Sequence, residues 1–481
     1  LSGGRIAVKR RKWLAALWAA LLLLTGCAPG PATEAEAPPP ATSAPVGTQT
    51  LAGVDFSAFL KEANAVRRAV LEDGPDLDLS PWTADFRDQN DTFTPEEMDR
   101  LTAPPEALPP LSRAGVEEDV ETLFTLLRTT YGAYTYFGGD EVFLPLKDAV
   151  RSDLEGERYL LSRDLEKVLV RHLAPVLVDG HFTLGSTAMR DGHAQYMYYV
   201  PGLYFSDTEG LDPAYVKPTI GPDGAIVHWF AALSHDGTDL PERQGDYELD
   251  WVRAGETPWD GLDVFTETEA EGIPVLTSRQ MYARKGRPPQ EEQLERFASC
   301  GGDYADESLF LFDLRANGGG SDIWIMDWFE GWAGQPAAPR RAFAHRVSQL
   351  SNRLMPEGYP ADRIGTWQTA DLESRWAQTD SVVLVLTDKG TASSGETAVK
   401  FFRAAGDVLF IGGPTLGCSL TPNNCNFYLP NTGLRVYFGT GLSFCESLEN
   451  IDGAGFLPDL WVEPADALDA AVRLCQYYNL K

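Results

Sequence analysis

One stretch of the chain constrains its fold more than any other: an apolar run that leads through a serine-rich turn into a helix. Residues 381–386 are continuously apolar after the first residue, which predicts a strand buried on both faces, and residues 397–405 predict the helix. Such a turn presents a hydroxyl at a helix N-terminus, where backbone N–H groups and the helix dipole favour negative charge. Ser393 or Ser394 is therefore a candidate nucleophile, although serines at this position also commonly cap helices.

The same strand–turn–helix order occurs earlier in the final third of the chain. Residues 309–314 predict a buried strand, 315–321 a glycine-rich turn, and 322–332 a helix with a period of 3.6 residues. Another strand is predicted at 408–411. Repeated units of this kind predict parallel βαβ structure, with both turns at the carboxyl edge of one sheet.

The glycine run in the earlier turn has two possible uses. A phosphate-binding P-loop needs a Lys-Ser/Thr pair after the glycines, and Ser321-Asp322 supplies no lysine. Backbone N–H groups of Gly318 and Gly319 could instead form an oxyanion hole, because glycine has no side chain to block a substrate carbonyl.

The rest of the chain predicts an α/β protein, α+β overall. Residues 54–182 are mostly helical in pattern, 183–300 form a β-rich section of short alternating runs, and 301–481 form an α/β core. The β-rich section contains no obvious PDZ-type peptide-binding signature.

The N-terminal residues have the features of a bacterial lipoprotein signal. A basic group (9–12) precedes an apolar run (13–24) that is too short to span a bilayer comfortably, and Cys27 follows at once. We therefore expect residues 1–26 to be a signal peptide and Cys27 to carry a lipid. Residues 27–53, rich in Pro, Ala and Thr, would tether an extracytoplasmic protein to the cell membrane.

Charge and cysteine content exclude several classes of protein. The net charge of −30 argues against nucleic-acid binding and against a basic membrane-binding patch. The cysteines beyond the signal show no CxxC or Cys/His spacing, so we expect no zinc site and no other cofactor. Cys418 and Cys425 are close enough in sequence for a hairpin disulfide. The oligomeric state is not predicted.

Four motifs in order resemble those of the carboxyl-terminal-processing (tail-specific) serine protease family. They are residues 313–320, 389–396, 412–417 and 453–459. The helical segment that ends in Asp179-Gly180-His181 is also similar to members of this family. The resemblance implies a ClpP/crotonase-like catalytic core and a peptide or protein substrate.

The resemblance also assigns roles to residues. Ser393 matches the nucleophile, and Glu396 and Thr415 match positions that support the site. The oxyanion hole would use the N–H of Ser394 together with that of either Gly318 or Gly319.

The family's catalytic lysine is missing from the matching position, which is Cys418 here. Neither Lys389, before the turn, nor Lys400, on the helix after it, fits the role. The tricorn-core-like branch uses Ser–His–Glu, and here His181 would be the base and Glu449 the orienting acid, with Glu446 as the second choice. A buried structural histidine and a solvated glutamate are the alternatives for these two residues.

Two functions follow from the resemblance. The first is a surface-anchored serine peptidase that works through an acyl-enzyme; hydrolysis of an ester or a cell-wall cross-link peptide would share this chemistry. The second is an inactive member of the fold that binds peptides or other ligands as an extracytoplasmic lipoprotein, which the cysteine at position 418 favours.

Overall fold

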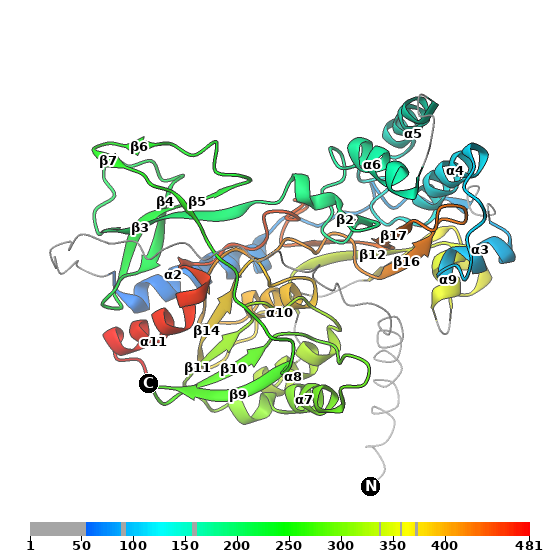
Figure 1. Ribbon diagram of the computed structural model, residues 1–481. Helices are drawn as coiled ribbons and strands as arrows, with labels where there is room; N and C mark the ends of the chain where they lie inside the picture. Colours follow the sequence, from blue (N-terminus) through cyan, green and yellow to red (C-terminus); the bar gives the residue numbers. More distant parts are fainter. Residues whose placement is uncertain (1–53, 88–92, 156–160, 336–337, 356–357, 371–373) are drawn as a thin grey trace, which may run out of the picture.

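The computed structural model describes residues 54–481 except 88–92, 156–160, 336–337, 356–357 and 371–373 (Figure 1). The predicted signal peptide (1–26), Cys27 and the predicted tether (27–53) therefore lie outside the described residues. No helix in the described part is both long enough and apolar enough to cross a membrane.

A mixed sheet forms the centre of the C-terminal part. Its strands, in order across the sheet, are β19 (Leu460–Trp461), β15 (Val408–Gly412), β14 (Val382–Thr387), β11 (Leu309–Asp313), β10 (Ile273–Ser278) and β9 (Phe265–Ala270). All neighbours pair in parallel except β9, which is antiparallel to β10. The predicted parallel βαβ order is therefore present, with one antiparallel edge strand added.

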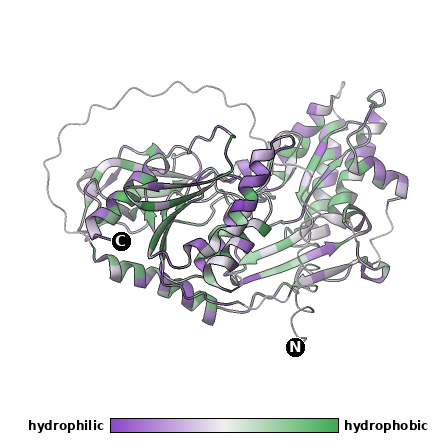
Figure 2. Cartoon of the chain, turned by 90° about the horizontal axis from the view of Figure 1, so that it is seen from below, coloured by the Kyte–Doolittle hydropathy of each residue, from purple (hydrophilic) through white to green (hydrophobic). Residues whose placement is uncertain are grey.

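Helices cover both faces of this sheet because alternate residues of its strands are apolar on opposite sides. Phe310 and Phe312 of β11 pack with α7 (Pro288–Ser299), α8 (Ile323–Ala333) and α10 (Ser394–Arg403). Leu309 and Leu311 face the other way, toward α2 (Phe56–Asp73) and α11 (Ala467–Tyr478) (Figure 1). Green and purple residues alternate along the outer helices, as expected for helices with one buried face (Figure 2).

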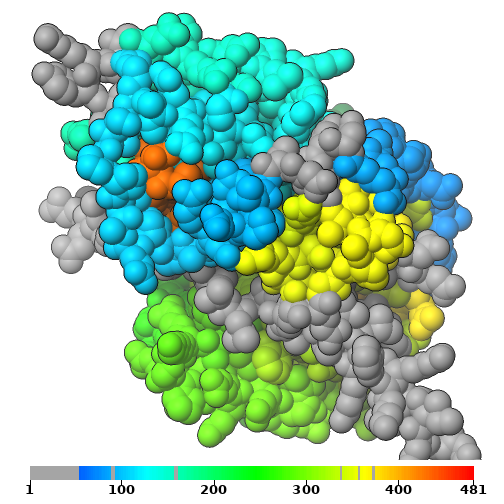
Figure 3. Space-filling view, turned by 90° about the vertical axis from the view of Figure 1, so that its right-hand side faces the viewer, coloured from blue at the N-terminus to red at the C-terminus, as the bar shows by residue number. Residues whose placement is uncertain are grey.

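The helical N-terminal region shares a core with strands from the end of the chain. Its helices are α3 (Pro95–Thr102), α4 (Arg113–Thr130), α5 (Gly139–Glu155) and α6 (Ser162–Leu173). They pack with a four-stranded sheet of order β16 (Asn424–Tyr428), β17 (Arg435–Gly439), β1 (Thr183–Leu184) and β2 (Thr187–Ala188). Figure 3 shows the result as orange atoms from the C-terminal third enclosed by blue and cyan atoms.

The middle section is β-rich, as predicted. Its main sheet has the order β4 (Val216–Ile220), β5 (Ile226–Ser234), β3 (Tyr196–Phe205) and β8 (Val252–Arg253), and a separate hairpin joins β6 (Arg243–Gln244) to β7 (Tyr247–Glu248). A three-stranded sheet of order β13 (Thr366–Ala370), β12 (Arg341–Val347) and β18 (Gly441–Cys445) comes from the last third of the chain and packs in the core of the N-terminal helices. The shorter elements are α9 (Gln349–Leu354), η2 (Met189–Gly192), η3 (Gly301–Tyr304), η4 (Ala361–Arg363) and η5 (Pro464–Asp466).

The structure confirms a mixed α/β class with a helical N-terminal region, a β-rich middle and a C-terminal mixed-sheet core. Segments on either side of the predicted domain boundaries nevertheless share sheets. The boundary at residue 300 separates β9 and β10 from the sheet to which they belong, and the boundary at residue 182 separates the helices from strands in their own core.

Candidate active site

Ser393 occupies a strained turn between β14 and α10. Its backbone has φ 52° and ψ −116°, a conformation that costs a non-glycine residue on the order of 1–3 kcal/mol. The side chain makes no capping hydrogen bond to the helix, and the hydroxyl of Ser394 donates instead to Gly320 O at 2.8 Å. Neither serine side chain caps α10, so capping does not explain this turn.

The glycine-rich turn after β11 packs directly against Ser393. A Cβ added to Gly319 would lie 2.7 Å from Ser393 Cβ, and φ at Gly319 is +93°, so this position requires glycine. The N–H of Gly319 donates to Asn317 Oδ1 at 2.9 Å and is therefore occupied. The N–H groups of Gly318 and Ser394 donate to no other described residue. Of the two predicted glycines, Gly318 is the one whose N–H is available for an oxyanion.

His181 lies beside the Ser393 hydroxyl although 212 residues separate them in sequence. Its Nε2 is 3.2 Å from Ser393 Oγ, and the side chain is 5% exposed. Burial, and then the positive charges of Arg190 and Lys400, lower the pKa of His181 to about 3. The imidazole is consequently neutral at neutral pH, which is the state that a general base needs. Its Nδ1 is buried and has no hydrogen-bond partner among the described residues.

The structure does not bring Glu449 to His181. Glu449 is exposed, and its one described hydrogen bond is from its backbone N–H to Ser447 Oγ. Glu446 instead forms an ion pair with Arg403, with a nitrogen–oxygen distance of 2.6 Å. In this structure neither predicted acid orients the imidazole, because one points into solvent and the other is paired elsewhere.

Two other carboxyl groups, missed by the sequence analysis as site residues, fix the backbone around His181. Asp179 accepts the His181 N–H at 2.8 Å and the Tyr131 hydroxyl at 2.6 Å. Asp452 accepts the Gly180 N–H at 2.8 Å. Burial raises the pKa of both, and the charge of Asp179 adds to this effect on Asp452, whose pKa rises to about 7. The sequence signal that could have identified them is that each is the first residue of an Asp-Gly run, Asp-Gly-His and Asp-Gly-Ala, respectively.

Glu396 and Thr415, which match supporting positions of the family, are in direct contact. The fully buried Glu396 carboxylate accepts hydrogen bonds from Thr415 Oγ1 at 2.6 Å and from the N–H groups of Gly417 and Cys418, each at 2.8 Å. Thr415 Oγ1 in turn accepts from Phe456 N at 2.8 Å. These contacts tie α10 to the loop after β15 and to the closing motif.

Cys418 lies against the segment that carries His181. A Cβ added to Gly180 would lie 2.5 Å from Cys418 Cα. None of the five cysteines in the described residues forms a disulfide. The predicted Cys418–Cys425 bond is therefore wrong: Cys425 is buried in β16, within the core of the N-terminal helices.

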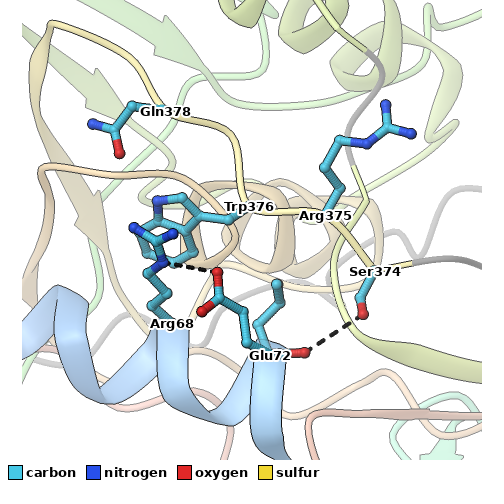
Figure 4. A pocket seen from close by; sticks show the side chains of 7 residues that line it. Arg68, Glu72, Ser374, Arg375, Trp376 and Gln378 are labelled. Carbon is cyan, nitrogen blue, oxygen red and sulfur yellow. Dashed lines mark hydrogen bonds and ion pairs between the residues drawn. The ribbon is translucent and has the colours of Figure 1, made fainter.

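The described residues contain no group of three or more His, Cys, Asp or Glu side chains placed to hold a metal ion. A surface cavity of about 600 Å³ lies elsewhere, between α2 and residues 374–378 (Figure 4). Arg68 in its wall pairs with Glu72 at 2.8 Å and stacks over Trp376 at 5.8 Å. Both charged side chains are about half exposed. We assign no ligand to this cavity.

Comparison with known proteins found a family profile that matches part of the chain. Residues 292–462 match the sequence profile of peptidase family S41. No curated protein matches the chain. Solved structures that match the chain include mature CPAF (13% identity, TM-score 0.44, covering 76% of this chain and 98% of that one). A second is the photosystem II D1 C-terminal processing protease (14% identity, TM-score 0.36, covering 76% of this chain and 97% of that one). A third is the tricorn protease (14% identity, TM-score 0.32, covering 76% of this chain and 37% of that one).

Proposed function

We propose that this protein is a serine peptidase with Ser393 as nucleophile and His181 as general base, because residues 292–462 match the profile of peptidase family S41. The observation that carries the proposal is the 3.2 Å distance between His181 Nε2 and Ser393 Oγ. A base must lie within about 3.2 Å of the group that it deprotonates, and this distance meets that limit in the absence of substrate.

The reaction follows from the positions of these groups. Ser393 Oγ attacks the peptide carbonyl as its proton passes to His181 Nε2, and the N–H groups of Gly318 and Ser394 stabilise the oxyanion. The imidazolium then gives its proton to the departing amine, which leaves an acyl-enzyme. Water, deprotonated by the same imidazole, releases the acid and restores Ser393.

Positioning of the imidazole in this scheme comes from its own backbone. Asp179 and Asp452 hold the N–H groups of His181 and Gly180, respectively. Glu449, which the sequence suggested for this task, is exposed and makes no contact with the ring. We therefore assign the role of the third group to this buried pair, which acts through the backbone.

A second candidate is a peptide- or ligand-binding protein that has lost the reaction. The observations that favour it are the cysteine at position 418 and the unpartnered Nδ1 of His181. A third residue normally accepts a hydrogen bond from that nitrogen and fixes the tautomer of the catalytic base.

A fluorophosphonate probe, which reacts with activated serines, separates the two candidates. We expect the wild-type protein to be labelled, Ser393→Ala to abolish labelling, and His181→Ala to slow it by about 100-fold or more, since general-base catalysis contributes about 10²–10⁴. His345→Gln, a buried histidine on β12, and Glu449→Gln serve as controls and should keep the wild-type rate. Well-folded wild-type protein that resists labelling would support the binding candidate.

We also propose that the protein is a lipoprotein anchored to the cell membrane outside the cytoplasm through Cys27. The support is the basic, apolar and cysteine-ended pattern of residues 1–27. The test is incorporation of a labelled fatty acid in bacteria that express the full chain. Cys27→Ala should abolish incorporation and release the protein from membranes, and unchanged membrane association of this variant would contradict the anchor.

A further inference from the structure

Lys389 is a buried cation that the proposed mechanism does not use. Its side chain is 7% exposed, and its Nζ donates to four backbone carbonyl oxygens, which are Thr415 O (3.1 Å), Leu416 O (3.1 Å), Gly453 O (2.8 Å) and Ala454 O (3.4 Å). No carboxylate of the described residues forms an ion pair with it. A buried ammonium is costly unless its protons are satisfied, and here the carbonyl groups of two separate loops satisfy them.

Glu396 holds the opposite side of the same loop. It accepts the N–H of Gly417 and of Cys418, each at 2.8 Å. The peptide unit between Leu416 and Gly417 therefore has its carbonyl at the Lys389 cation and its N–H at the Glu396 anion. Both interactions are charge-assisted, and each such hydrogen bond is about twice as strong as a neutral one.

These two residues flank the nucleophile in sequence and so connect it rigidly to the loop. Lys389 lies four positions before Ser393, and Glu396 lies three positions after it. Leu416 N also donates to Thr391 O at 2.8 Å, which adds a direct bond between the loop and the nucleophile turn.

The loop in turn supports the segment that carries His181. A Cβ at Gly180 would lie 2.5 Å from both Cys418 Cα and Gly417 O, so the two backbones are in direct contact. Asp452 accepts from Gly180 N and from Ser419 N, each at 2.8 Å, and so bonds the two segments to one carboxyl group. Residues 417–419 cannot shift without moving Gly180 and the histidine that follows it.

We propose that Lys389 is a positioning residue, which fixes residues 415–418 between itself and Glu396 and thereby holds His181 against the Ser393 hydroxyl. The catalytic consequence rests on the proposed function, whereas the structural one does not. A displacement of about 1 Å at a reacting group can cost roughly 100-fold in rate. Loss of the cation should therefore reduce reactivity at Ser393 although Lys389 touches neither reacting side chain.

The experiment compares Lys389→Met with the wild type by two measurements on the whole chain. Hydrogen–deuterium exchange, read by mass spectrometry, reports the backbone of residues 413–420 and 178–182, and the fluorophosphonate reaction reports Ser393. We expect Lys389→Met to accelerate exchange in both segments by at least 10-fold, to leave exchange in β11 and β14 unchanged, and to slow labelling by at least 10-fold. Lys389→Arg, which keeps the positive charge and the hydrogen-bond donors, should recover most of the wild-type protection from exchange and most of the labelling rate.

The control is Lys217→Met. Lys217 lies on β4 of the middle sheet, and its Nζ donates to a single carbonyl oxygen, Pro213 O, at 3.2 Å. It should change neither measurement. If the wild-type protein cannot be labelled but Lys389→Met still exchanges faster than the wild type, the positioning role stands and the peptidase is rejected. Unchanged exchange in Lys389→Met would overturn the positioning role, as would slower labelling that Lys389→Arg does not recover. If Lys389→Met loosens every sheet, Lys389→Gln is measured instead, and general loosening there too would overturn the proposal.

Discussion

Ser393 maintains an unfavourable backbone conformation because hydrogen bonds on both sides hold its turn. Ala392 N donates to Asn317 O at 2.8 Å, Gly395 N to Ala392 O at 2.8 Å, and Thr397 N to Ser393 O at 2.9 Å. The first of these bonds joins the nucleophile turn to the glycine-rich turn. Strain that persists under such constraint is characteristic of functional sites, where it points a side chain outward.

The environment of His181 predicts an unusual pH dependence. Burial lowers the pKa of this imidazole from 6.5 to about 3, so the base stays neutral well below pH 6. We expect the rate of fluorophosphonate labelling to be nearly constant from about pH 7 down to about pH 5, instead of falling below pH 6.5 as for an ordinary histidine. Stopped-time labelling across this range, on protein shown to be folded at each pH, provides the measurement.

Lys400 gives a variant that tests the cause. Its positive charge also lowers the pKa of His181, after burial and Arg190. Lys400→Met should therefore move the acid limb of the labelling profile to higher pH, by less than the effect of burial itself. A wild-type profile that already falls between pH 6 and 7 would show that His181 titrates normally.

Asp452 predicts that stability falls as pH rises. Burial and the neighbouring Asp179 raise the pKa of Asp452 from 3.8 to about 7. Between these two pH values the folded protein binds more protons than the unfolded chain, so the free energy of unfolding decreases with increasing pH. We expect unfolding in urea to require roughly 2.5 kcal/mol less free energy at pH 7.5 than at pH 5, since each pKa unit corresponds to about 1.36 kcal/mol and the difference acts over nearly two pH units.

The contribution of this group is isolated by substitution. Asp452→Asn should flatten the pH dependence relative to the wild type, whereas Asp212→Asn, an exposed residue of the middle section, should leave it unchanged. Equal slopes for all three proteins would contradict a raised pKa at position 452.

At the scale of elements, the glycine-rich turn packs against the turn that carries Ser393. This contact predicts different stability costs for alanine at the adjacent positions Gly318 and Gly319. An alanine at Gly319 would place its Cβ 2.7 Å from Ser393 Cβ and 2.8 Å from Ala392 O, at a φ of +93°. An alanine at Gly318 would meet no atom within 4 Å. We expect Gly319→Ala to cost roughly 1–3 kcal/mol of stability and Gly318→Ala less than about 0.5 kcal/mol. Chemical denaturation of both variants measures this, and equal costs would contradict the close approach of the turns.

Local patterns predicted the elements of the core well because these strands and helices are long and strongly periodic. The strand expected at 381–386 is observed as Val382–Thr387, and the helix expected at 322–332 as Ile323–Ala333. The composition of residues 74–110, rich in Asp and Pro, predicts irregular chain, although this stretch contains α3 with a capping box at Thr94. That helix has only eight residues, so its periodic signal is short.

Local sequence patterns do not predict which distant segments pair with each other. β1 pairs with β17 across more than two hundred residues, and Tyr437 is the partner of Thr183. The buried partners of the site, Asp452 and Lys389, depend on these long-range contacts. The sequence shows a carboxyl group and an amine, but only the folded chain shows which backbone groups they meet. For the same reason the sequence pointed to Glu449 and Glu446 and not to Asp452, which lies three residues after Glu449.

At the scale of the whole molecule, α2 shows how the start of the described chain is attached to the central sheet. Arg67 on this helix is buried, donates to Val408 O at 2.8 Å, and forms an ion pair with Asp459 of the closing motif. The same Asp459 carboxylate accepts Phe410 N at 2.8 Å. The closing Pro458-Asp459 motif therefore has a structural explanation, since its carboxylate joins α2 to β15.

This attachment predicts a large difference between two neighbouring arginines. Arg67→Met leaves Asp459 without its buried partner, and breaking a buried pair on one side costs about 3–5 kcal/mol. Arg68→Met removes an exposed pair with Glu72, whose side chains are 51% and 47% exposed, and the contact of Arg68 with the Trp376 ring. Exposed pairs and exposed cation–π contacts each contribute about 1 kcal/mol or less. Guanidinium-induced unfolding should therefore show a much lower midpoint for Arg67→Met than for Arg68→Met. Similar midpoints would mean that α2 is not fastened to the core through Asp459, and that its apolar contacts with β15 and α11 alone keep it in place.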